Sequence, residues 1–504
     1  MRFDHVIVGA GTSGCVLAAR LSEDPRRRVL LLEAGPDYPQ AGTLPAVLED
    51  SYGMPREPWD WGLEATIGER RVPLGAGRVV GGTSQVGGAG AWRPPAADFD
   101  AWAARGLPAW SWANVVDSFR RGETDLDYGD APWHGDRGPM PIARWREEEL
   151  SAPMAGWLEA VTGAGWPYCE DMNAPEAIGV GVNPQSRRGR ARVSAATAYL
   201  TPARARPGLE IRAGATVERI ALAGDRALGV IVDGEFIEGG EVIVCAGVPL
   251  SAALLLRSGI GPAAELRALG IATAVDLPGV GGGVRDQPAS VILAVPPENG
   301  SAQVPFLQLA ARGTGFPGFA PDGAAYLCLF AYMPVEPALQ PMLRATRVHW
   351  LIVADLAPAG TGRIVLRSAD PREPPECDLG LYGCEEDLRR MRAGLRSAWE
   401  IAQHPAFTAT IDRFALIGEK TIGNDARVDD LLRKRTFSRQ PWGGCPMGPD
   451  GDAGAVVDSG CRVRGLEGLR VVDSSVVPVP LRAGGVLTCT MLGERIAEVI
   501  AGED

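Results

Sequence analysis

The stretch FDHVIVGAGTSGCVLAARL, residues 3–21, contains a short apolar strand, a glycine-rich turn and a helix of small residues in immediate succession. A second apolar run, residues 29–32, ends in Glu33, which lies 24 residues after Gly9. This order of strand, G-x-G-x-x-G turn, helix and acid-terminated strand predicts a βαβ unit that binds a dinucleotide. Glycine-rich turns are common, so a βαβ turn with a structural role only is the alternative.

Each part of this unit has a physical task. Gly9 permits the tight turn, Gly11 lets a pyrophosphate approach the backbone, and Gly14 lets the helix pack closely on the strand. The N–H groups and the dipole at the helix N-terminus then face the phosphates. Glu33 is placed to accept hydrogen bonds from both ribose hydroxyls. The predicted contacts are Gly9, Gly11, Thr12, Ser13, Gly14, Glu33 and Ala34.

Three further segments favour FAD over NAD as the dinucleotide. GRVVGGTS, residues 77–84, is a second glycine-dense loop, and LLLRSGIGP, residues 254–262, predicts a helix that ends at a glycine turn. LRVVDSS, residues 469–475, predicts a strand that ends in an acid and precedes a C-terminal helix. These segments lie far apart in the sequence, as expected for an extended flavin cofactor threaded through a discontinuous domain.

Composition excludes several classes of partner. The net charge of −12 over 504 residues argues against nucleic acid or an anionic membrane as a partner. No apolar run approaches eighteen residues, so no membrane span is expected. The first strand lies so close to Met1 that a secretory signal is not expected, which favours a cytoplasmic location. The nine cysteines form no C-x-x-C pair, so neither a metal site nor a disulfide framework is predicted.

The chain resembles the glucose–methanol–choline oxidoreductase family along nearly its whole length. The resemblance is carried by motifs such as VIVGAGTSGCVLAARL, GRVVGGTS, WHGDRGPMPI, SAATAYLTPA, SGIGPAAELRALGI and LRVVDSSVVP. It implies an α/β (α+β) fold, in which a Rossmann-like FAD-binding domain is assembled from discontinuous segments. A substrate domain with an antiparallel sheet and flanking helices would complete the molecule. Residues 1–155, 190–290 and 435–504 are expected in the FAD domain, and residues 156–189 and 291–434 in the substrate domain.

The resemblance also implies further cofactor contacts. The loop that runs past the isoalloxazine and ribityl groups contributes Arg78, Gly81, Gly82, Thr83 and Ser84. Val217 matches a position whose backbone meets adenine, and Asp473 and Ser474 match the strand end near the ribityl and pyrophosphate groups. Some relatives carry a flavin-bonded histidine near this loop. Gln85 follows Ser84 here, so we expect the FAD to be held non-covalently.

The catalytic positions depart from the family pattern. Relatives open a motif like H-P-x-G-T-C-x-M-G with the histidine that takes the hydroxyl proton, and this chain has Gln440 there. The second catalytic position, usually His or Asn, falls at about Val486. A carboxamide hydrogen-bonds but cannot hold a proton, and general-base assistance contributes roughly 10²–10⁴-fold to rate. Gln440 and Arg482 are the candidates for orienting a substrate.

These observations leave three hypotheses for the reaction of a small-molecule substrate. The first is an FAD-dependent oxidoreductase that passes a hydride from an alcohol-like substrate to flavin N5, with O2 or another acceptor completing the cycle; secondary metabolism is one setting for it. The second is a redox-neutral flavoenzyme, such as a lyase, a cyclase or a light-driven decarboxylase, in which Arg482 or Arg439 pairs with a substrate carboxylate. The third is a flavoprotein without turnover. The sequence leaves the oligomeric state open.

Local patterns predict a few elements of the substrate domain. Residues 386–402 are expected to form an amphipathic helix, and residues 348–367 two strands around a glycine-containing turn. Residues 296–325 are rich in Pro, Gly and Ala and are expected to be loops or a lid over the pocket. The histidines His5, His134, His349 and His404 are interpreted as structural.

Overall fold

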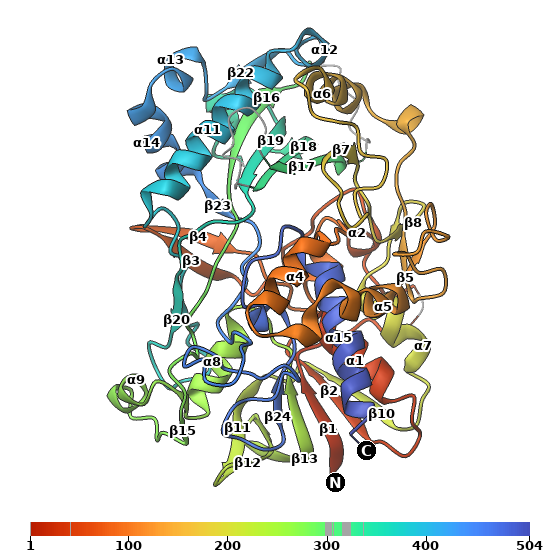
Figure 1. Ribbon diagram of the computed structural model, residues 1–504, viewed down its shortest axis with the longest axis vertical. Helices are drawn as coiled ribbons and strands as arrows, with labels where there is room; N and C mark the ends of the chain where they lie inside the picture. Colours follow the sequence, from red (N-terminus) through yellow and green to blue (C-terminus); the bar gives the residue numbers. More distant parts are fainter. Residues whose placement is uncertain are drawn as a thin grey trace.

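The computed structural model describes residues 2–40, 42–297, 305, 307–314, 324–335 and 337–503. Its lower half in Figure 1 contains a sheet whose parallel part begins with β1 (Phe3–Val8) between β2 (Val29–Glu33) and β13 (Glu235–Val244). The strands β10 (Leu209–Ala213) and β24 (Leu469–Val471) extend this parallel layer through β2 and β13. Most of these strands are buried runs of Val, Ile and Leu, as parallel strands covered on both faces require.

Two helices from opposite ends of the chain cover this layer. α1 (Thr12–Leu21) and α15 (Gly485–Ala501) lie side by side, and both chain termini end near the same edge of the sheet in Figure 1. α1 packs closely because its buried face carries alanine and glycine. An antiparallel extension is formed where β13 continues into β12 (Arg226–Val232) and β11 (Val217–Ala223). The dinucleotide-type fold predicted from the first residues is confirmed.

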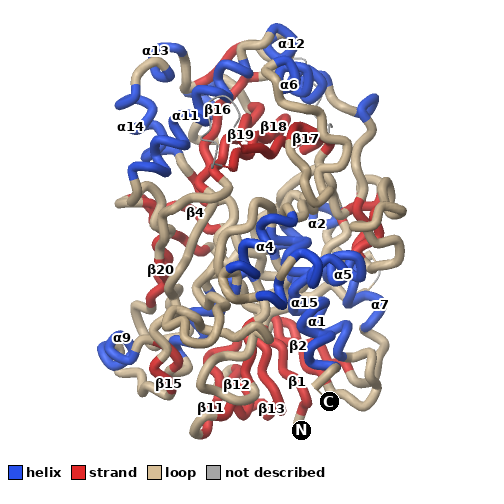
Figure 2. Tube along the Cα trace, in the orientation of Figure 1, coloured by secondary structure: helices blue, strands red, loops and turns tan. Residues whose placement is uncertain are grey.

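The upper half contains a second sheet in which every strand pair is antiparallel. Its order is β22 (Arg413–Ala415), β16 (Pro288–Val295), β19 (Arg347–Asp355), β18 (Ala324–Pro334), β17 (Leu307–Thr314) and β7 (Gly179–Val182), with β23 (Phe437–Ser438) paired to β16. Helices accompany it, as Figure 2 shows in blue: α6 (Ala152–Gly163), α11 (Glu385–Ala402), α12 (Pro405–Thr408), α13 (Glu419–Ile422) and α14 (Asp425–Arg435). The expected antiparallel sheet with flanking helices is confirmed.

A small sheet joins segments that the sequence assigned to different domains. Its order is β20 (Arg363–Val365), β21 (Glu376–Asp378), β3 (Leu63–Ile67) and β4 (Arg70–Leu74). Likewise, β16 begins inside the segment 190–290, and β23 lies inside the segment 435–504. The expected domain boundaries therefore remain a prediction, since strands of both halves cross them.

The remaining elements are short. They are α2 (Ala46–Glu49), α3 (Thr83–Val86), α4 (Ala96–Ala104), α5 (Trp112–Gly122), α7 (Thr201–Ala203), α8 (Leu250–Arg257), α9 (Ala263–Ala268), α10 (Gln340–Leu343), β5 (Glu123–Asp125), β6 (Met140–Ile142), β8 (Arg187–Arg188), β9 (Ala191–Arg192), β14 (Ile260–Gly261) and β15 (Val275–Asp276).

Of two local predictions, one is confirmed and one needs correction. The two strands predicted in the region 348–367 are β19, in the large antiparallel sheet, and β20, in the small one. Within the presumed loop 296–325, residues 307–314 form β17, because strand pairing with β7 and β18 outweighs the composition. The parts of that loop at 298–304, 306 and 315–323 lie outside the described residues.

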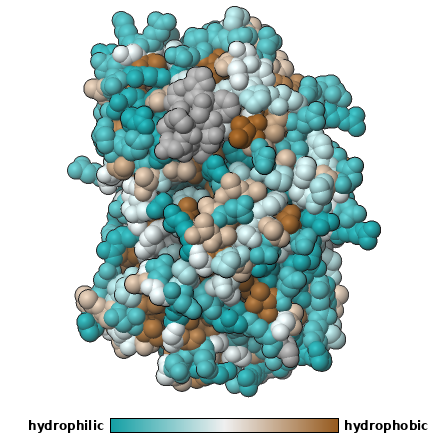
Figure 3. Space-filling model, viewed as in Figure 1, coloured by the Kyte–Doolittle hydropathy of each residue, from teal (hydrophilic) through white to brown (hydrophobic). Residues whose placement is uncertain are grey.

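The hydropathy of one face and of the helices can be described for the residues that the structure covers. In Figure 3 the visible face is mostly hydrophilic, and apolar atoms gather only in small separate areas. Among the helices of the described ranges, none combines the length and the apolar character needed to cross a bilayer.

Candidate functional site

A cavity of about 410 Å³ lies where the first glycine turn, the second glycine loop and the start of α15 meet. Most of the predicted site residues line it, although they come from distant parts of the chain. These are Gly9, Gly11, Thr12, Ser13, Glu33, Ala34, Gly82, Thr83, Ser84, Val217, Gln440, Asp473, Ser474 and Val486. Gly14, Arg78, Gly81 and Arg482 are not among the lining residues.

The first glycine turn has the tight geometry that was predicted. Gly9 has a φ of +100°, and a Cβ there would lie 2.6 Å from the carbonyl oxygen of Cys245 on the neighbouring strand. A Cβ on Gly14 would lie 2.0 Å from the carbonyl oxygen of Gly9, so only glycine lets α1 approach the strand end. Gly11 caps α1 without a side-chain hydrogen bond, which leaves the first N–H groups of the helix available to an anion.

The second glycine loop packs directly onto the first. Gly81 donates its N–H to the carbonyl of Ala10 at 2.8 Å. A Cβ on Gly82 would lie 2.7 Å from the Cα of Gly11, so the two backbones touch at this point. The guanidinium of Arg78 lies outside the lining and stacks over Trp61, whose ring borders the cavity, at 4.9 Å. The loop therefore presents backbone and small side chains to the cavity.

Glu33 is buried at the end of β2, beside the glycine turn. Its two carboxylate oxygens accept hydrogen bonds from the backbone N–H groups of Ala10 at 3.0 Å and Gly35 at 2.8 Å. Burial raises the pKa of Glu33 to about 7, and these hydrogen bonds oppose that rise. A carboxylate at this place suits ribose hydroxyls, because its oxygens can accept hydrogen bonds from them in addition to those from the two amides.

Asp473 follows β24 and lines the same cavity. One of its oxygens accepts from the Ser251 hydroxyl at 2.6 Å and from the Gly247 N–H at 2.8 Å. The other oxygen accepts from the N–H of Ser475 at 2.7 Å. The contact of Ser251 with Asp473 could not be predicted from the sequence, because only the folded chain brings α8 beside β24.

The predicted catalytic residues Gln440 and Val486 lie together at one end of the cavity. The backbone N–H of Gln440 donates to Asp286 at 2.8 Å, and its side-chain Oε1 accepts from the N–H of Gly485 at 3.1 Å. Gly485 is the first residue of α15, so Gln440 satisfies one of the N–H groups at the helix start. A flipped amide would set donor against donor, so this contact fixes which end of the carboxamide faces Gly485.

Asp286 and Gln287 are buried and contact Gln440 and Arg439. Burial raises the pKa of Asp286 to about 6. Gln287 is fully buried, donates to the carbonyl of Leu481 at 2.8 Å, and accepts from the guanidinium of Arg439. Arg439 lines the cavity next to Gln440. No sequence motif could assign these contacts, because their partners are 152 to 194 residues away.

Arg482, the third predicted catalytic residue, is engaged elsewhere. Its Nε donates to Asp98 at 2.6 Å, and its backbone N–H donates to the same carboxylate at 2.7 Å. Trp442 is buried and does not border the cavity, so it packs rather than forming a pocket wall. Cys445 is buried as well, and burial raises the pKa of its thiol.

None of the four histidines, all within the described residues, lines the cavity. His404 caps α12, accepting from the N–H of Ala406 at 3.2 Å, and His5 lies 3.4 Å from Glu241. His349 is buried in β19, and burial lowers its pKa to about 4.

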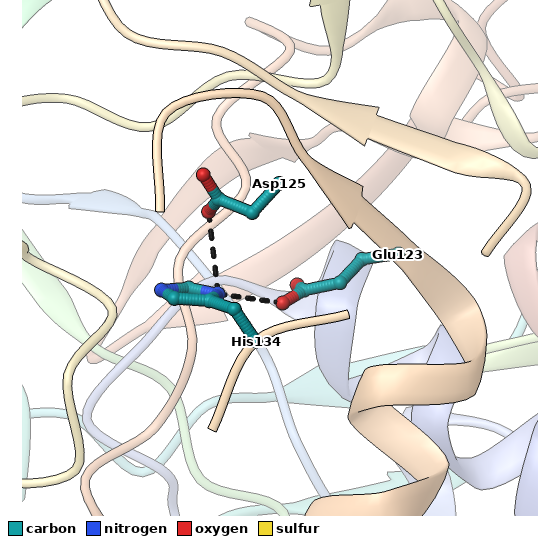
Figure 4. A group of neighbouring side chains, drawn as sticks. All are labelled: Glu123, Asp125 and His134. Carbon is teal, nitrogen blue, oxygen red and sulfur yellow. Dashed lines mark hydrogen bonds and ion pairs between the residues drawn. The ribbon is translucent and has the colours of Figure 1, made fainter. Parts of the chain in front are cut away.

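The fourth histidine belongs to a buried ionic cluster. Figure 4 shows His134 between Glu123 and Asp125, with its Nδ1 2.7 Å from Glu123 and 3.2 Å from Asp125. These three side chains have the types and spacing of a metal site. However, Arg93 binds Glu123 and Arg144 binds Asp125, and both guanidinium groups are buried. We therefore interpret the group as an ionic network in which arginine supplies the cations.

Comparison with known proteins identifies the family. Models described as GMC oxidoreductase match residues 3–289 and residues 358–493. The chain is 36% identical to an uncharacterised GMC-type oxidoreductase from Rhodococcus erythropolis, over 99% of both chains. It is 34% identical to an oxygen-dependent choline dehydrogenase from Xanthomonas axonopodis pv. citri, over 99% of this chain and 96% of the relative.

A solved structure agrees with these matches. Pyridoxine 4-oxidase from Mesorbium loti superposes with a TM-score of 0.89 and 28% identity, over 99% of each chain. GMC oxidoreductases bind FAD, and the observed features fit that group: touching glycine backbones, a buried acid at the end of β2 and an uncapped helix N-terminus in one cavity. The resemblance drawn from the motifs is confirmed: the chain belongs to the glucose–methanol–choline (GMC) oxidoreductase family.

Proposed function

We propose that this protein is an FAD-dependent oxidoreductase that oxidises the CH–OH group of a small molecule without a catalytic histidine. The observation that supports the proposal is that Gln440 and Val486 border the same cavity as the glycine turn and Glu33. Bound FAD would supply the hydride acceptor. The cavity-lining residues that would hold it are Gly9, Gly11, Glu33, Gly82 and Asp473.

The side chains at the reacting end favour orientation over proton removal. Because Oε1 of Gln440 already accepts from Gly485, its amide nitrogen would donate a hydrogen bond to the substrate oxygen. Val486 adds an apolar wall. Neither group accepts a proton at neutral pH, so the hydroxyl proton would leave to water or to the substrate itself.

We further propose that the FAD is bound non-covalently. Gln85 is buried and donates to the carbonyl of Leu48 at 3.1 Å, and an amide is no nucleophile. The cavity-lining cysteines are Cys245 and Cys489, and burial raises the pKa of both thiols far from the thiolate range. Acid precipitation of the purified yellow protein should therefore release all flavin into the supernatant. Flavin that stays with the pellet would contradict this assignment.

Anaerobic mixing with candidate alcohols tests the reaction itself. A substrate should bleach the flavin absorbance, and admission of air should restore the absorbance if O2 is the acceptor. We propose O2 as the electron acceptor, because one relative is an oxygen-dependent choline dehydrogenase. A protein that binds FAD but is bleached by no alcohol, aldehyde or hydroxy acid would contradict oxidase or dehydrogenase activity.

The variant Gln440→His tests the role of the missing base. A histidine near neutral pKa can accept the hydroxyl proton, so kcat toward simple alcohols should rise by at least about tenfold, the lower part of the range for general-base catalysis. Gln440→Asn, which keeps the amide but shortens it, is the matched control and should not gain activity. An unchanged rate across a broad alcohol panel in Gln440→His would count against an alcohol-oxidising scaffold.

A redox-neutral flavin reaction is the second candidate, and one observation favours it. No histidine lines the cavity, whereas Arg439 borders it next to Gln440. A lyase, a cyclase or a light-driven decarboxylase would need no alcohol base. Product formation without an electron acceptor, in darkness or under blue light, would favour this candidate over an oxidoreductase.

Two further predictions from the sequence, on location and on metabolism, remain predictions. A cytoplasmic location and a place in secondary metabolism are expectations that localisation of the tagged protein and metabolite profiling would test.

A further inference from the structure

We propose that Arg257 and the segment 371–375 form the wall of the cavity that binds the adenosine half of FAD. The inference rests on the proposed function and adds residues that are not among the predicted cofactor contacts. Arg257 is the last residue of α8, and the segment 371–375 is the loop that leads directly into β21. Both line the same cavity as the glycine turn, although they lie far apart in the sequence.

Packing brings the end of α8 beside β11, which begins with the expected adenine contact Val217. Helix α8 lies against β11, and the hydroxyl of Ser258, the residue after the helix, accepts from the backbone N–H of Ile220 at 2.8 Å. Val217 and Arg257 both line the cavity. The arginine is therefore on the side of the cavity where the sequence places adenine.

A hydrogen bond joins the loop to this helix. Nη2 of Arg257 donates to the backbone carbonyl of Glu373 at 2.9 Å, and the two residues are 116 positions apart in the sequence. Next to Glu373, Arg372 binds Asp370 at 2.7 Å. This hydrogen bond raises the pKa of Arg372, and the charge of Glu218 adds to the rise, so the loop also lies close to the start of β11.

The lining of this wall suits a flat aromatic ring. Most of its side chains are apolar, and they come from both α8 and the loop. The apolar members are Leu250, Leu254, Pro371, Pro374 and Pro375. Arg257 adds a planar guanidinium, which stacks on aromatic faces, and nucleic-acid bases are bound in this way by other proteins.

The charges of the wall favour a base over a phosphate. Burial lowers the pKa of Arg257, and the charge of Asp370 opposes this effect. Arg257 and Arg372 carry two positive charges, whereas Asp370, Glu218 and the cavity-lining Glu373 carry three negative ones. These five residues therefore provide no net attraction for an anion. The pyrophosphate has its own donors, the N–H groups at the start of α1.

The affinity for FAD tests the inference. Arg257→Ala removes the guanidinium plane and the hydrogen bond to the loop, so the Kd of the flavin-stripped, full-length protein for FAD should rise at least about tenfold. Quenching of flavin fluorescence measures this Kd. Arg226→Ala is the control: it removes an exposed arginine that pairs with Glu467 on another part of the chain, and it should leave the Kd unchanged. An unchanged Kd in a folded Arg257→Ala protein would overturn the inference.

Two probes that differ only in the base localise the contact. AMP and ribose 5-phosphate carry the same sugar and phosphate, and only AMP carries adenine. In calorimetric titrations of the stripped protein, AMP should bind at least about tenfold more tightly, and Arg257→Ala should reduce this preference. Ribose 5-phosphate that binds as tightly as AMP, or equal losses for both probes in Arg257→Ala, would overturn the inference.

Hydrogen exchange of the unsubstituted protein tests the loop without any variant. Amides within residues 370–377 should exchange more slowly in the FAD-loaded protein than in the stripped protein, because the cofactor would pack against them. Equal exchange rates in the two states would overturn the inference, even if Arg257→Ala fails to fold.

The two proposals fail in distinguishable ways. A colourless protein that takes up no FAD would contradict the proposed function itself. A yellow protein in which Arg257→Ala keeps full affinity for FAD would leave the flavoprotein in place and contradict the adenosine wall alone.

Discussion

Single residues of the cavity handle protons differently. Gln440 cannot take up a proton at all, whereas Glu33, which lines the same cavity, has its pKa raised to about 7 by burial. A group with that pKa changes charge within the physiological range, so the binding step should depend on pH at Glu33.

The Glu33 carboxyl should make FAD affinity rise with pH. Ribose hydroxyls donate best to the ionised acid, and a group of pKa about 7 is about one-tenth ionised at pH 6 and nine-tenths ionised at pH 8. FAD should therefore bind about tenfold more tightly at pH 8 than at pH 6, as measured by flavin fluorescence quenching with protein stripped of FAD. Glu33→Gln should bind weakly with a flat pH profile. Glu210→Gln, on the half-exposed face of β10, should keep the wild-type profile, and a flat wild-type profile would contradict the assigned role.

Residues whose task is set by the local backbone were the ones that the sequence could predict. Gly9 and Gly11 follow from the turn itself, and Glu33 from its place at a strand end. The contacts of Gln287 with Arg439 and Leu481 could not be predicted, because they join chain segments that only the fold brings together.

The strand–turn–helix element at the N-terminus depends on one close approach. A methyl group on Gly14 would lie 2.0 Å from the carbonyl oxygen of Gly9, so Gly14→Ala must push α1 away from β1. The variant should lose about 3 kcal/mol of unfolding free energy and most of its FAD, since the helix N-terminus would no longer face the phosphates. Urea denaturation and the ratio of flavin to protein absorbance measure both effects.

Gly90→Ala is the matched control for this element. A Cβ at Gly90 meets no atom within 4 Å, and its φ lies outside the left-handed region. The control should change stability by less than about 1 kcal/mol. If Gly14→Ala behaves like this control, close helix–strand packing is not what the turn requires.

Elements with a strong local pattern were predicted well, and those that depend on pairing were not. The helix expected at 386–402 is α11, which begins at Glu385, because its apolar stripe has helical spacing. Residues 307–314 carry no such signal, and they become β17 only because β7 and β18 lie on either side.

At the scale of the whole molecule, the ionic cluster connects segments that the sequence assigned to separate domains. The Nδ1 atom of His134 lies 2.7 Å from a carboxylate oxygen of Glu123, and its Nε2 atom lies 3.0 Å from a carboxylate oxygen of Asp171. Asp171 lies beyond the domain boundary expected at residue 155. Burial alone would lower the pKa of His134, but its hydrogen bonds to Asp171 and Glu123 outweigh burial and raise it. With the imidazole protonated, His134, Arg93 and Arg144 balance the three carboxylates Glu123, Asp125 and Asp171.

Loss of this network should weaken both halves of the molecule together. His134→Gln leaves buried carboxylates short of one cation, so the free energy of unfolding should fall by about 3 kcal/mol. The raised pKa means that the stabilisation is fully present below pH 6.5 and is lost as pH rises through the folded-state pKa, so the deficit should be larger at pH 6 than at pH 9. Tryptophan and flavin fluorescence should report a single transition in both proteins, and EDTA should leave the melting temperature unchanged. A melting temperature that falls with EDTA and recovers with zinc would show instead that the cluster holds a metal.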